Sequence, residues 1–75
     1  MRELIEFIAK NLVSEPDEVK VEEVPSGRQT VIELTVARGD VGKVIGKQGR
    51  TARALRSLLK VAAAKQDKRA NLEIL

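Results

Sequence analysis

Two glycines, Gly46 and Gly49, enclose a lysine and a glutamine near the middle of the chain. Glycine permits a tight turn and leaves space for another molecule to approach the main chain closely. A helix is predicted directly after Gly49, and the N–H groups of its first turn would lack intrahelical partners and carry partial positive charge. With the ammonium group of Lys47 beside them, these N–H groups favour binding of a phosphate.

Three further cations flank this 46–49 loop: Lys43 precedes it, and Arg50 and Arg53 follow it. Such side chains can contact neighbouring phosphates of one strand, and these contacts position a nucleic acid without reading its sequence. The alternative is a plain joint between two helices, made of a C-cap and a turn. Because glycines at this spacing are common, the spacing alone does not separate the two interpretations.

The charge of the chain is divided between its two halves, although the net charge is only +3. Residues 1–33 hold four basic and eight acidic side chains, whereas residues 34–75 hold ten basic and three acidic ones. Between residues 38 and 60, seven Lys and Arg side chains accompany a single acid, Asp40. This density favours a polyanionic partner, and an ordinary solvated helix surface is the alternative.

The composition excludes much of enzyme chemistry. The chain has no cysteine and no histidine, which removes thiol catalysis, Ser-His nucleophiles, disulfides and nearly all structural zinc sites. Residues 42–48 superficially resemble a P-loop, but three residues instead of four separate the glycines, and Gln48 stands where Ser or Thr is needed. We therefore expect no catalytic residue, no metal and no cofactor.

The length of 75 residues predicts a single domain spanning residues 1–75. No apolar stretch approaches the roughly 18 residues of a membrane span, and the start of the chain lacks the basic-then-apolar pattern of a signal peptide. We therefore expect a cytoplasmic protein without a membrane partner.

The first half of the chain predicts a helix followed by a hairpin. Residues 2–13 place apolar side chains at helical spacing, and Pro16 ends this helix. Residues 18–24 alternate with period two and form the predicted first strand, and residues 25–28 supply the turn. The expected apolar face of the second strand consists of Ile32, Leu34 and Val36.

The second half predicts a short helix, the 46–49 loop, a long helix and a closing strand. Asp40 is well placed to cap the short helix, residues 41–45, by accepting N–H bonds in its first turn. The long helix covers residues 50–66 and the strand residues 70–74. The order α-β-β-α-α-β with a right-handed crossover predicts an α+β fold, in which helices pack on one face of a three-stranded sheet. The core side chains expected from the long helix are Leu55, Leu58, Leu59 and Ala62.

Residues 41–56 (VGKVIGKQGRTARALR) closely resemble the signature of KH domains, whose GXXG loop clamps about four nucleotides of backbone. The predicted order of elements is that of the type II KH fold. The whole chain resembles bacterial KhpA-type RNA-binding proteins, which are little more than one KH domain. The resemblance implies a non-catalytic binder of single-stranded RNA, acting as an RNA chaperone or post-transcriptional regulator. Single-stranded DNA remains an alternative ligand, because nothing in the sequence identifies a contact to a 2′-OH group.

The resemblance further implies a groove between the two helices and a sheet edge, in which Val44 and Ile45 support unstacked bases. Ile45 and Leu55 are also candidates for plain core positions. Phe7 is the sole aromatic residue, so base stacking cannot dominate. The residues expected to contact RNA are Lys43, Ile45, Gly46, Lys47, Gln48, Gly49, Arg50 and Arg53.

The resemblance also implies protein partners. KhpA-like proteins are associated with self-pairing and with pairing to a larger Jag-type protein, KhpB, which joins a KH domain to a second nucleic-acid-binding domain. A protein interaction module in which RNA contact is secondary is therefore the main alternative function. Its surface would be the stripe of Ala54, Leu58 and Val61, unless this stripe is buried against the sheet.

Overall fold

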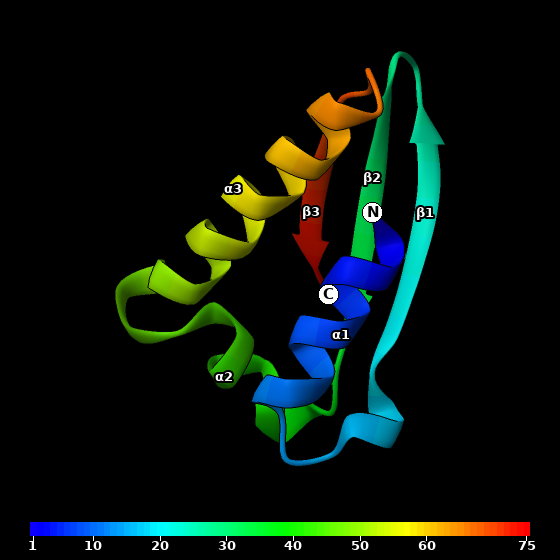
Figure 1. The fold of residues 1–75 in the computed structure, drawn as a ribbon. Coiled ribbons are helices and arrows are strands. Elements are labelled where there is room, and N and C mark those ends of the chain that lie inside the picture. The colour runs from blue at the N-terminus through cyan, green and yellow to red at the C-terminus, as the bar shows by residue number, and fades with distance from the viewer.

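The computed structural model describes residues 1–75 and has the predicted order of elements, α-β-β-α-α-β (Figure 1). Short 3₁₀ turns occur at Pro16–Glu18 and Arg38–Asp40. The helices and strands are α1 (Arg2–Leu12), β1 (Lys20–Ser26), β2 (Gln29–Thr35), α2 (Val41–Ile45), α3 (Arg50–Lys65) and β3 (Ala70–Ile74).

β1 and β2 form an antiparallel hairpin with a tighter turn than predicted. Pairing continues to Ser26 and Gln29, so the loop contains only two residues. The first of them, Gly27, has a φ of 64°, the positive value that the first loop position of a type II′ turn needs. Pro25 lies within β1 instead of in the turn, and an edge strand tolerates it.

β1 also begins later than predicted. Pro16 occupies the first position of a 3₁₀ turn, where its missing N–H group removes no intrahelical bond, and this turn includes Glu18. The N–H group of Val19 donates to the carbonyl of Pro16 over 3.1 Å, which closes the turn. The strand therefore starts at Lys20 and not at residue 18.

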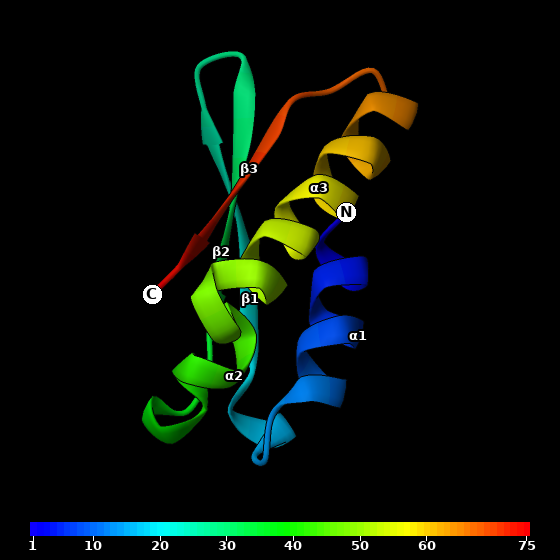
Figure 2. The ribbon, with the colours of Figure 1, turned by 90° about the vertical axis from the view of Figure 1, so that its left-hand side faces the viewer.

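The sheet has the strand order β1-β2-β3, with β3 parallel to β2. The segment between β2 and β3 contains α2 and α3 and supplies the crossover that a parallel pair requires. α1 and α3 lie on one face of the sheet, and the other face carries no helix (Figure 2). The predicted α+β fold is confirmed. No helix in the structure is both long and apolar enough to cross a membrane.

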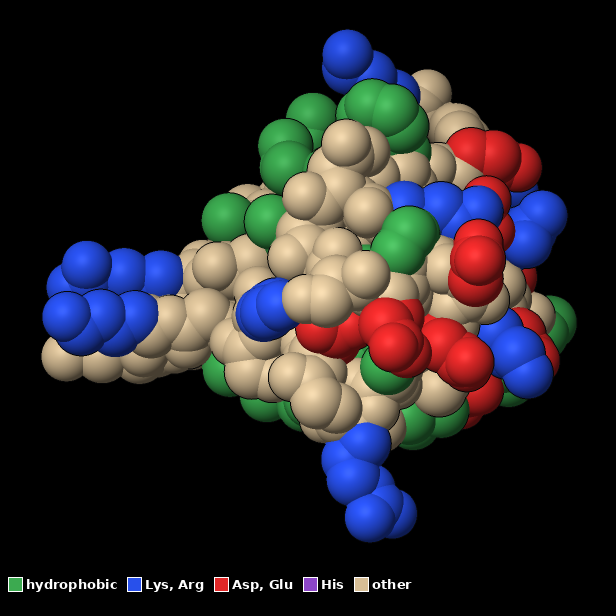
Figure 3. All heavy atoms as spheres, turned by 90° about the horizontal axis from the view of Figure 1, so that it is seen from below, with side chains coloured by type: hydrophobic (Ala, Val, Ile, Leu, Met, Phe, Trp, Pro, Cys, Tyr) green, Lys and Arg blue, Asp and Glu red, His purple; other side chains and the backbone are tan.

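Positive side chains are concentrated at one end of the surface. Figure 3 shows Lys and Arg side chains projecting at the left, where the loop between α2 and α3 lies in Figure 1. Acidic side chains lie in the middle and on the right of this view, together with other Lys and Arg side chains. The loop end of the molecule therefore has the positive potential that attracts a polyanion.

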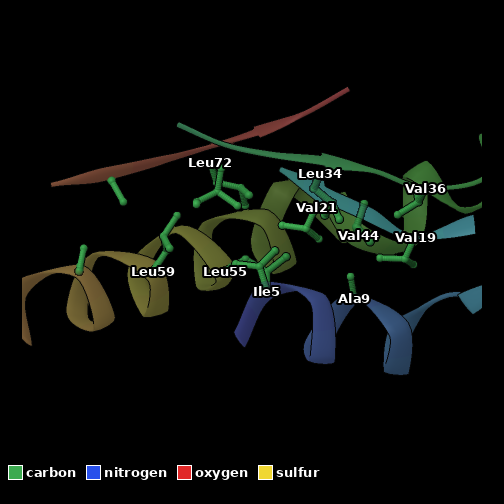
Figure 4. Packing of buried hydrophobic residues seen from close by; sticks show 13 residues of the cluster. Ile5, Ala9, Val19, Val21, Leu34, Val36, Val44, Leu55, Leu59 and Leu72 are labelled. Carbon is green, nitrogen blue, oxygen red and sulfur yellow. The ribbon is translucent and has the colours of Figure 1, made fainter. Parts of the chain in front are cut away.

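The hydrophobic core lies between the helices and the covered face of the sheet. Ile5 of α1 and Leu55 of α3 lie close together beneath the strands (Figure 4). Val44 places α2 in the same core and is fully buried, so the short helix has a fixed position. The members of the cluster are Ile5, Ala9, Val19, Val21, Ile32, Leu34, Val36, Val44, Leu55, Leu59, Ala63, Ala70 and Leu72.

The buried face of α3 differs from the predicted one. Leu55 and Leu59 are buried as expected, but Leu58 is 47% exposed. Leu58 points away because the helix rotates about 100° per residue and the sheet-facing stripe is centred on positions 55, 59 and 63. Ala54 and Val61 are exposed with it, so the stripe of Ala54, Leu58 and Val61 is not buried against the sheet. The buried side chains of α3 are Ala52, Leu55, Leu59 and Ala63.

α3 ends in a Schellman motif. The N–H group of Lys68 donates to the carbonyl of Ala63 over 2.9 Å, and the N–H group of Asp67 donates to the carbonyl of Ala64 over 3.0 Å. Asp67 therefore holds the left-handed position of the motif, with a φ of 57°. This position is usually glycine, because a Cβ atom is strained there.

We expect Asp67→Gly to stabilise the protein by about 0.5–1 kcal/mol. The substitution removes the strained Cβ atom and also a negative charge at the negative end of the helix dipole. Urea denaturation followed by circular dichroism measures the change. Asp67→Ala is the control, since it removes the charge and keeps the Cβ atom. If the alanine variant were as stable as the glycine variant, the backbone explanation would be wrong.

The open face of the sheet carries a row of three glutamates. Glu22 pairs with Glu33 across β1 and β2, and Glu33 pairs with Glu73 across β2 and β3. None of the three forms an ion pair with a Lys or Arg side chain. Like charges directly opposite one another destabilise a sheet.

We expect Glu33→Gln to stabilise the protein by about 0.5 kcal/mol, and by more at low ionic strength, because it removes both repulsive contacts of the row. Thermal unfolding at two salt concentrations tests this expectation. Glu23→Gln is the control: Glu23 is exposed but pairs with Ile32 and lies outside the row. An equal gain in both variants would show that total charge, and not the row, is responsible.

Candidate nucleic-acid interface

The 46–49 loop reverses the chain between α2 and α3 with three residues at positive φ. Gly46 ends α2 with φ 77° and ψ 171°. Gln48 and Gly49 follow in the left-handed region, with φ values of 57° and 73°. A left-handed conformation is unusual for a residue with a side chain, so the surrounding structure must hold Gln48 in place.

The two glycines of the loop serve different purposes. A Cβ atom added to Gly46 would lie 2.2 Å from the hydroxyl oxygen of Thr51 and 2.9 Å from its backbone nitrogen. Gly46 is therefore required because the loop packs directly against the first turn of α3. A Cβ atom on Gly49 would meet no atom within 4 Å. Gly49 is needed for its backbone conformation, and the space beside it is open to a ligand.

Two arginines of α3 hold the strained part of the loop. Arg50 donates from Nη2 to the side-chain oxygen Oε1 of Gln48 over 3.1 Å. Arg53 donates from Nη2 to the backbone carbonyl of Gln48 over 3.2 Å. Both arginines are exposed, so their remaining N–H groups are accessible. The same side chains fix the loop and place positive charge beside it.

A groove of about 340 Å³ lies between the loop, α3 and the edge strand β3. It has the predicted boundaries, two helices and a sheet edge, and no acidic side chain lines it. The lining residues are Ile45, Gln48, Gly49, Ala52, Arg53, Arg56 and Ile74.

The aliphatic residues near the groove are placed differently from one another. Ile45 is 39% exposed and lines the groove, so its interpretation as a core residue is wrong. Val44 is fully buried and cannot support a base, which corrects the prediction for this residue. Leu55 is buried in the hydrophobic core, which confirms its interpretation as a core residue.

Three residues that line the groove are absent from the predicted contact set: Ala52, Arg56 and Ile74. Arg56 follows Arg53 by three positions, and this helical spacing was available from the sequence. Ile74 comes from the end of the chain, and only the parallel pairing of β3 with β2 brings it to the groove.

Lys43 lies outside the groove, in a second hollow near the start of α2. Its ammonium group is 3.4 Å from Oδ1 of Asp40 and also hydrogen-bonds the hydroxyl of Ser14. The structure therefore joins Lys43 to the segment that follows α1, in a hollow that Lys47, Arg50 and Arg53 do not line.

The predicted cap of α2 is wrong. Asp40 precedes α2, but its carboxylate accepts no backbone N–H group from the first turn of that helix. It accepts the backbone N–H groups of Ser14 and Glu15 instead, each over 3.1 Å. A capping side chain requires an extended backbone, whereas Asp40 has helical angles of −102° and −5° because it ends a 3₁₀ turn.

Asp40 is 3% exposed and is the single buried charged residue. Burial by itself raises the pKa of Asp40, but the N–H groups of Ser14 and Glu15 and the ammonium group of Lys43 outweigh it and lower the pKa. The carboxylate stays ionised at neutral pH and ties the segment after α1 to the segment before α2. We call this set of Ser14, Glu15, Asp40 and Lys43 the Asp40 latch.

Two helices joined by a Gly-x-x-Gly loop, beside the edge of a three-stranded mixed sheet, define a KH domain. Comparison with known sequences agrees: the family described as KhpA/KhpB, KH domain, matches residues 2–74. The chain belongs to this family.

Several curated relatives are similar over the whole chain. The RNA-binding protein KhpA of Clostridium acetobutylicum is 53% identical over 75 residues, which is 100% of both chains. The RNA-binding protein KhpA of Borreliella burgdorferi is 53% identical over 73 residues, 97% of this chain and 89% of the relative. That of Chlamydia trachomatis is 47% identical over 75 residues, 100% of this chain and 96% of the relative. No solved structure matches the chain.

Proposed function

We propose that this protein binds single-stranded RNA without catalysis, as an RNA chaperone or post-transcriptional regulator, and that the 46–49 loop clamps the sugar-phosphate backbone. The groove between the loop, α3 and β3 carries this proposal. It combines an accessible main chain at Gly49, arginines from α3, and isoleucines from α2 and β3, with no acid among its lining residues. The name RNA-binding protein KhpA of the relatives supports the choice of RNA.

The residues have distinct proposed roles in this groove. Gly49 lets the phosphate backbone reach the loop, and Lys47 and Arg50 supply charge on its exposed side. Arg53 and Arg56 contact the next phosphates, because both line the groove. Ile45 and Ile74 provide the apolar surface against which unstacked bases rest.

The test is fluorescence anisotropy with a labelled single-stranded RNA of about four nucleotides, the length that a KH groove holds. The double variant Lys47→Asp, Gln48→Asp should lose binding, because two negative charges would face the phosphates. Wild type should bind with an affinity that falls as salt rises. Single-stranded DNA of the same sequence measures the preference for RNA.

The chain offers a matched control. Lys65 and Gln66 form the same dipeptide at the far end of α3 and are exposed. Lys65→Asp, Gln66→Asp changes the net charge equally and leaves the groove intact, so it should bind the short RNA like wild type. Circular dichroism first establishes that all three proteins are folded. If the loop variant bound as well as the control, the loop would be structural and the proposal would fail.

We also propose that the protein pairs through α3, with a second copy or with the KH domain of a Jag-type KhpB protein. The stripe of Ala54, Leu58 and Val61 supports this proposal, because Val61 is 58% exposed and the whole stripe faces away from the sheet. One family description covers both KhpA and KhpB, so the two KH domains are alike. A second RNA-binding domain would raise the affinity beyond what a few nucleotides supply.

Light scattering after size-exclusion chromatography tests the pairing. Wild type at tens of micromolar should have the mass of a dimer, and Val61→Lys should be a monomer, because the charge cannot be buried in an apolar contact. Phe7→Lys is the control: Phe7 is exposed on α1 and lies outside the stripe. A wild-type monomer would refute self-pairing, and mixing with a KhpB KH domain would then test the heteromer.

A further inference from the structure

A third hollow, of about 270 Å³, lies between α3 and β3 at the end opposite the 46–49 loop. Three cations surround it: Lys60 from α3, and Lys68 and Arg69 from the turn that leads into β3. We call it the distal basic pocket. Its lining residues are Gln29, Lys60, Ala63, Lys68, Arg69, Ala70 and Asn71.

The three cations have no acidic partner. No carboxylate lies within ion-pair distance of Lys60, Lys68 or Arg69, although Asp67 is adjacent in sequence. All three are exposed, so their charges are accessible to a ligand. By contrast, Lys10 and Lys43 each contact an acidic side chain.

The pocket also contains groups that suit a sugar-phosphate chain in addition to charge. Asn71 and Gln29 line the pocket, and Nδ2 of Asn71 donates to Oε1 of Gln29 over 3.4 Å. By the alternation of the strands, both side chains project from the open face of the sheet, the face that carries Glu73. Each retains an unused donor or acceptor. Amides and cations together are the usual partners of phosphate and ribose oxygens.

The distal basic pocket continues the proposed RNA groove. Arg53 and Arg56 line the groove and Lys60 lines the pocket, so the cations follow one side of α3. Lys60 lies four positions after Arg56, which is about one helical turn. β3 forms the other wall of both hollows, with Ile74 at the groove and Asn71 at the pocket. Figure 2 shows β3 running back along α3 from one end to the other.

We propose that the distal basic pocket is a second phosphate-binding subsite, which receives the continuation of the RNA strand held by the 46–49 loop. This inference rests on the proposed function and extends it. The loop fixes about four nucleotides, and the pocket binds phosphates of the following stretch. The protein therefore prefers a single strand longer than the groove alone requires.

The experiment measures the dependence of binding on RNA length. Wild type and the double variant Lys68→Gln, Arg69→Gln are titrated with labelled RNAs of about four and about twelve nucleotides. The variant should bind the longer RNA about tenfold more weakly, and the slope of its affinity against salt should fall by about 1.4, since each phosphate contact contributes about 0.7. The shorter RNA should bind equally to both proteins.

A second double variant, Lys20→Gln, Arg38→Gln, provides the control. Both residues are exposed and line neither the groove nor the distal basic pocket. The two substitutions change the net charge by the same amount as those of the distal variant. An equal loss in this control would assign the effect to total charge and overturn the proposal, as would an unchanged affinity of the distal variant for the longer RNA. The variant Lys47→Asp, Gln48→Asp separates failure of this inference from failure of the proposed function. If the groove binds RNA, this variant weakens binding of both the shorter and the longer RNA.

Discussion

Gly46→Ala should cost about 3 kcal/mol of folding free energy or more and abolish RNA binding. At φ 77° and ψ 171°, Gly46 has a conformation that only glycine readily adopts. An added Cβ atom would also overlap Thr51, at 2.2 Å from the hydroxyl oxygen and 2.7 Å from the Cβ atom. Urea denaturation measures the loss of stability, and anisotropy with the short RNA measures binding.

Gly49→Ala is the matched comparison within the same loop. Its Cβ atom would meet nothing, so only the left-handed backbone costs free energy, about 1–2 kcal/mol. The variant should fold, and any loss of RNA affinity then reports the methyl group in the open space beside the loop. Equal destabilisation by the two alanines would contradict the contact between Gly46 and Thr51.

The double variant Gly46→Ala, Thr51→Ala separates the clash with the hydroxyl oxygen of Thr51 from the clash with its Cβ atom and backbone nitrogen. Removing the hydroxyl relieves the shortest approach, but the Cβ atom and the backbone nitrogen of Thr51 remain within 3 Å of the new methyl group. We expect only a small recovery of stability. A full recovery would show that the hydroxyl alone makes glycine necessary at position 46.

Asp40→Ala should destabilise the protein strongly at neutral pH. The substitution removes the buried acceptor of two N–H groups, those of Ser14 and Glu15, and leaves Lys43 without its carboxylate. The loss should exceed that of Glu6→Gln, which removes a partly exposed ion pair with Lys10 at 3.9 Å. Urea midpoints of the two variants test the comparison, and a smaller loss for Asp40→Ala would contradict the structural role of the Asp40 latch.

The pH dependence gives a second test of the latch. Because folding lowers the pKa of Asp40, its carboxylate contributes stability at pH values above about 3.9, and this contribution is lost as the pH falls through the lowered value. The stability difference between wild type and Asp40→Asn should therefore be constant near neutral pH and shrink below about pH 4. Glu3, whose pKa is lowered by its own backbone N–H group and by the amino terminus, is present in both proteins and cancels.

The latch also bears on the proposed function. Val44 anchors the short α2 in the core, and Asp40 fixes the segment that leads into it. We expect Asp40→Asn, if folded, to bind the short RNA more weakly than wild type even though the residue lies outside the groove. An unchanged affinity would show that packing of Val44 is sufficient to position the loop.

The elements could be predicted from the sequence because each depends on local patterns. Each signal lies within a short stretch of sequence. These signals are the helical periodicity of residues 2–13 and 50–66, the alternation around Ile32 and Leu34, and the glycines at 46 and 49. The order of these elements, together with the handedness of the crossover, was enough to predict the sheet and its covered face. The errors at residue 18 and Pro25 are shifts of strand ends by about two residues, where local signals compete.

The roles of individual side chains were decided by contacts between distant parts of the chain. Asp40 has the position and residue type of a helix cap, but Ser14 and Glu15, some 25 residues earlier, offer N–H groups that its backbone angles let it reach. Lys43 lies outside the groove because its ammonium group pairs with the carboxylate of Asp40. Leu58 is as apolar as Leu55, and only the placement of α3 against the sheet determines which of them is buried.

The sequence by itself therefore determined the fold, the 46–49 loop and the concentration of positive charge around it, because periodicity, glycine conformation and charge are properties of neighbouring residues. Only the tertiary structure decided which residues form the groove. Ile74 reaches it from the end of the chain through pairing of β3 with β2, and Lys43 is withdrawn by a buried carboxylate. A binding surface is made of residues far apart in sequence, and their meeting depends on packing that local patterns do not encode.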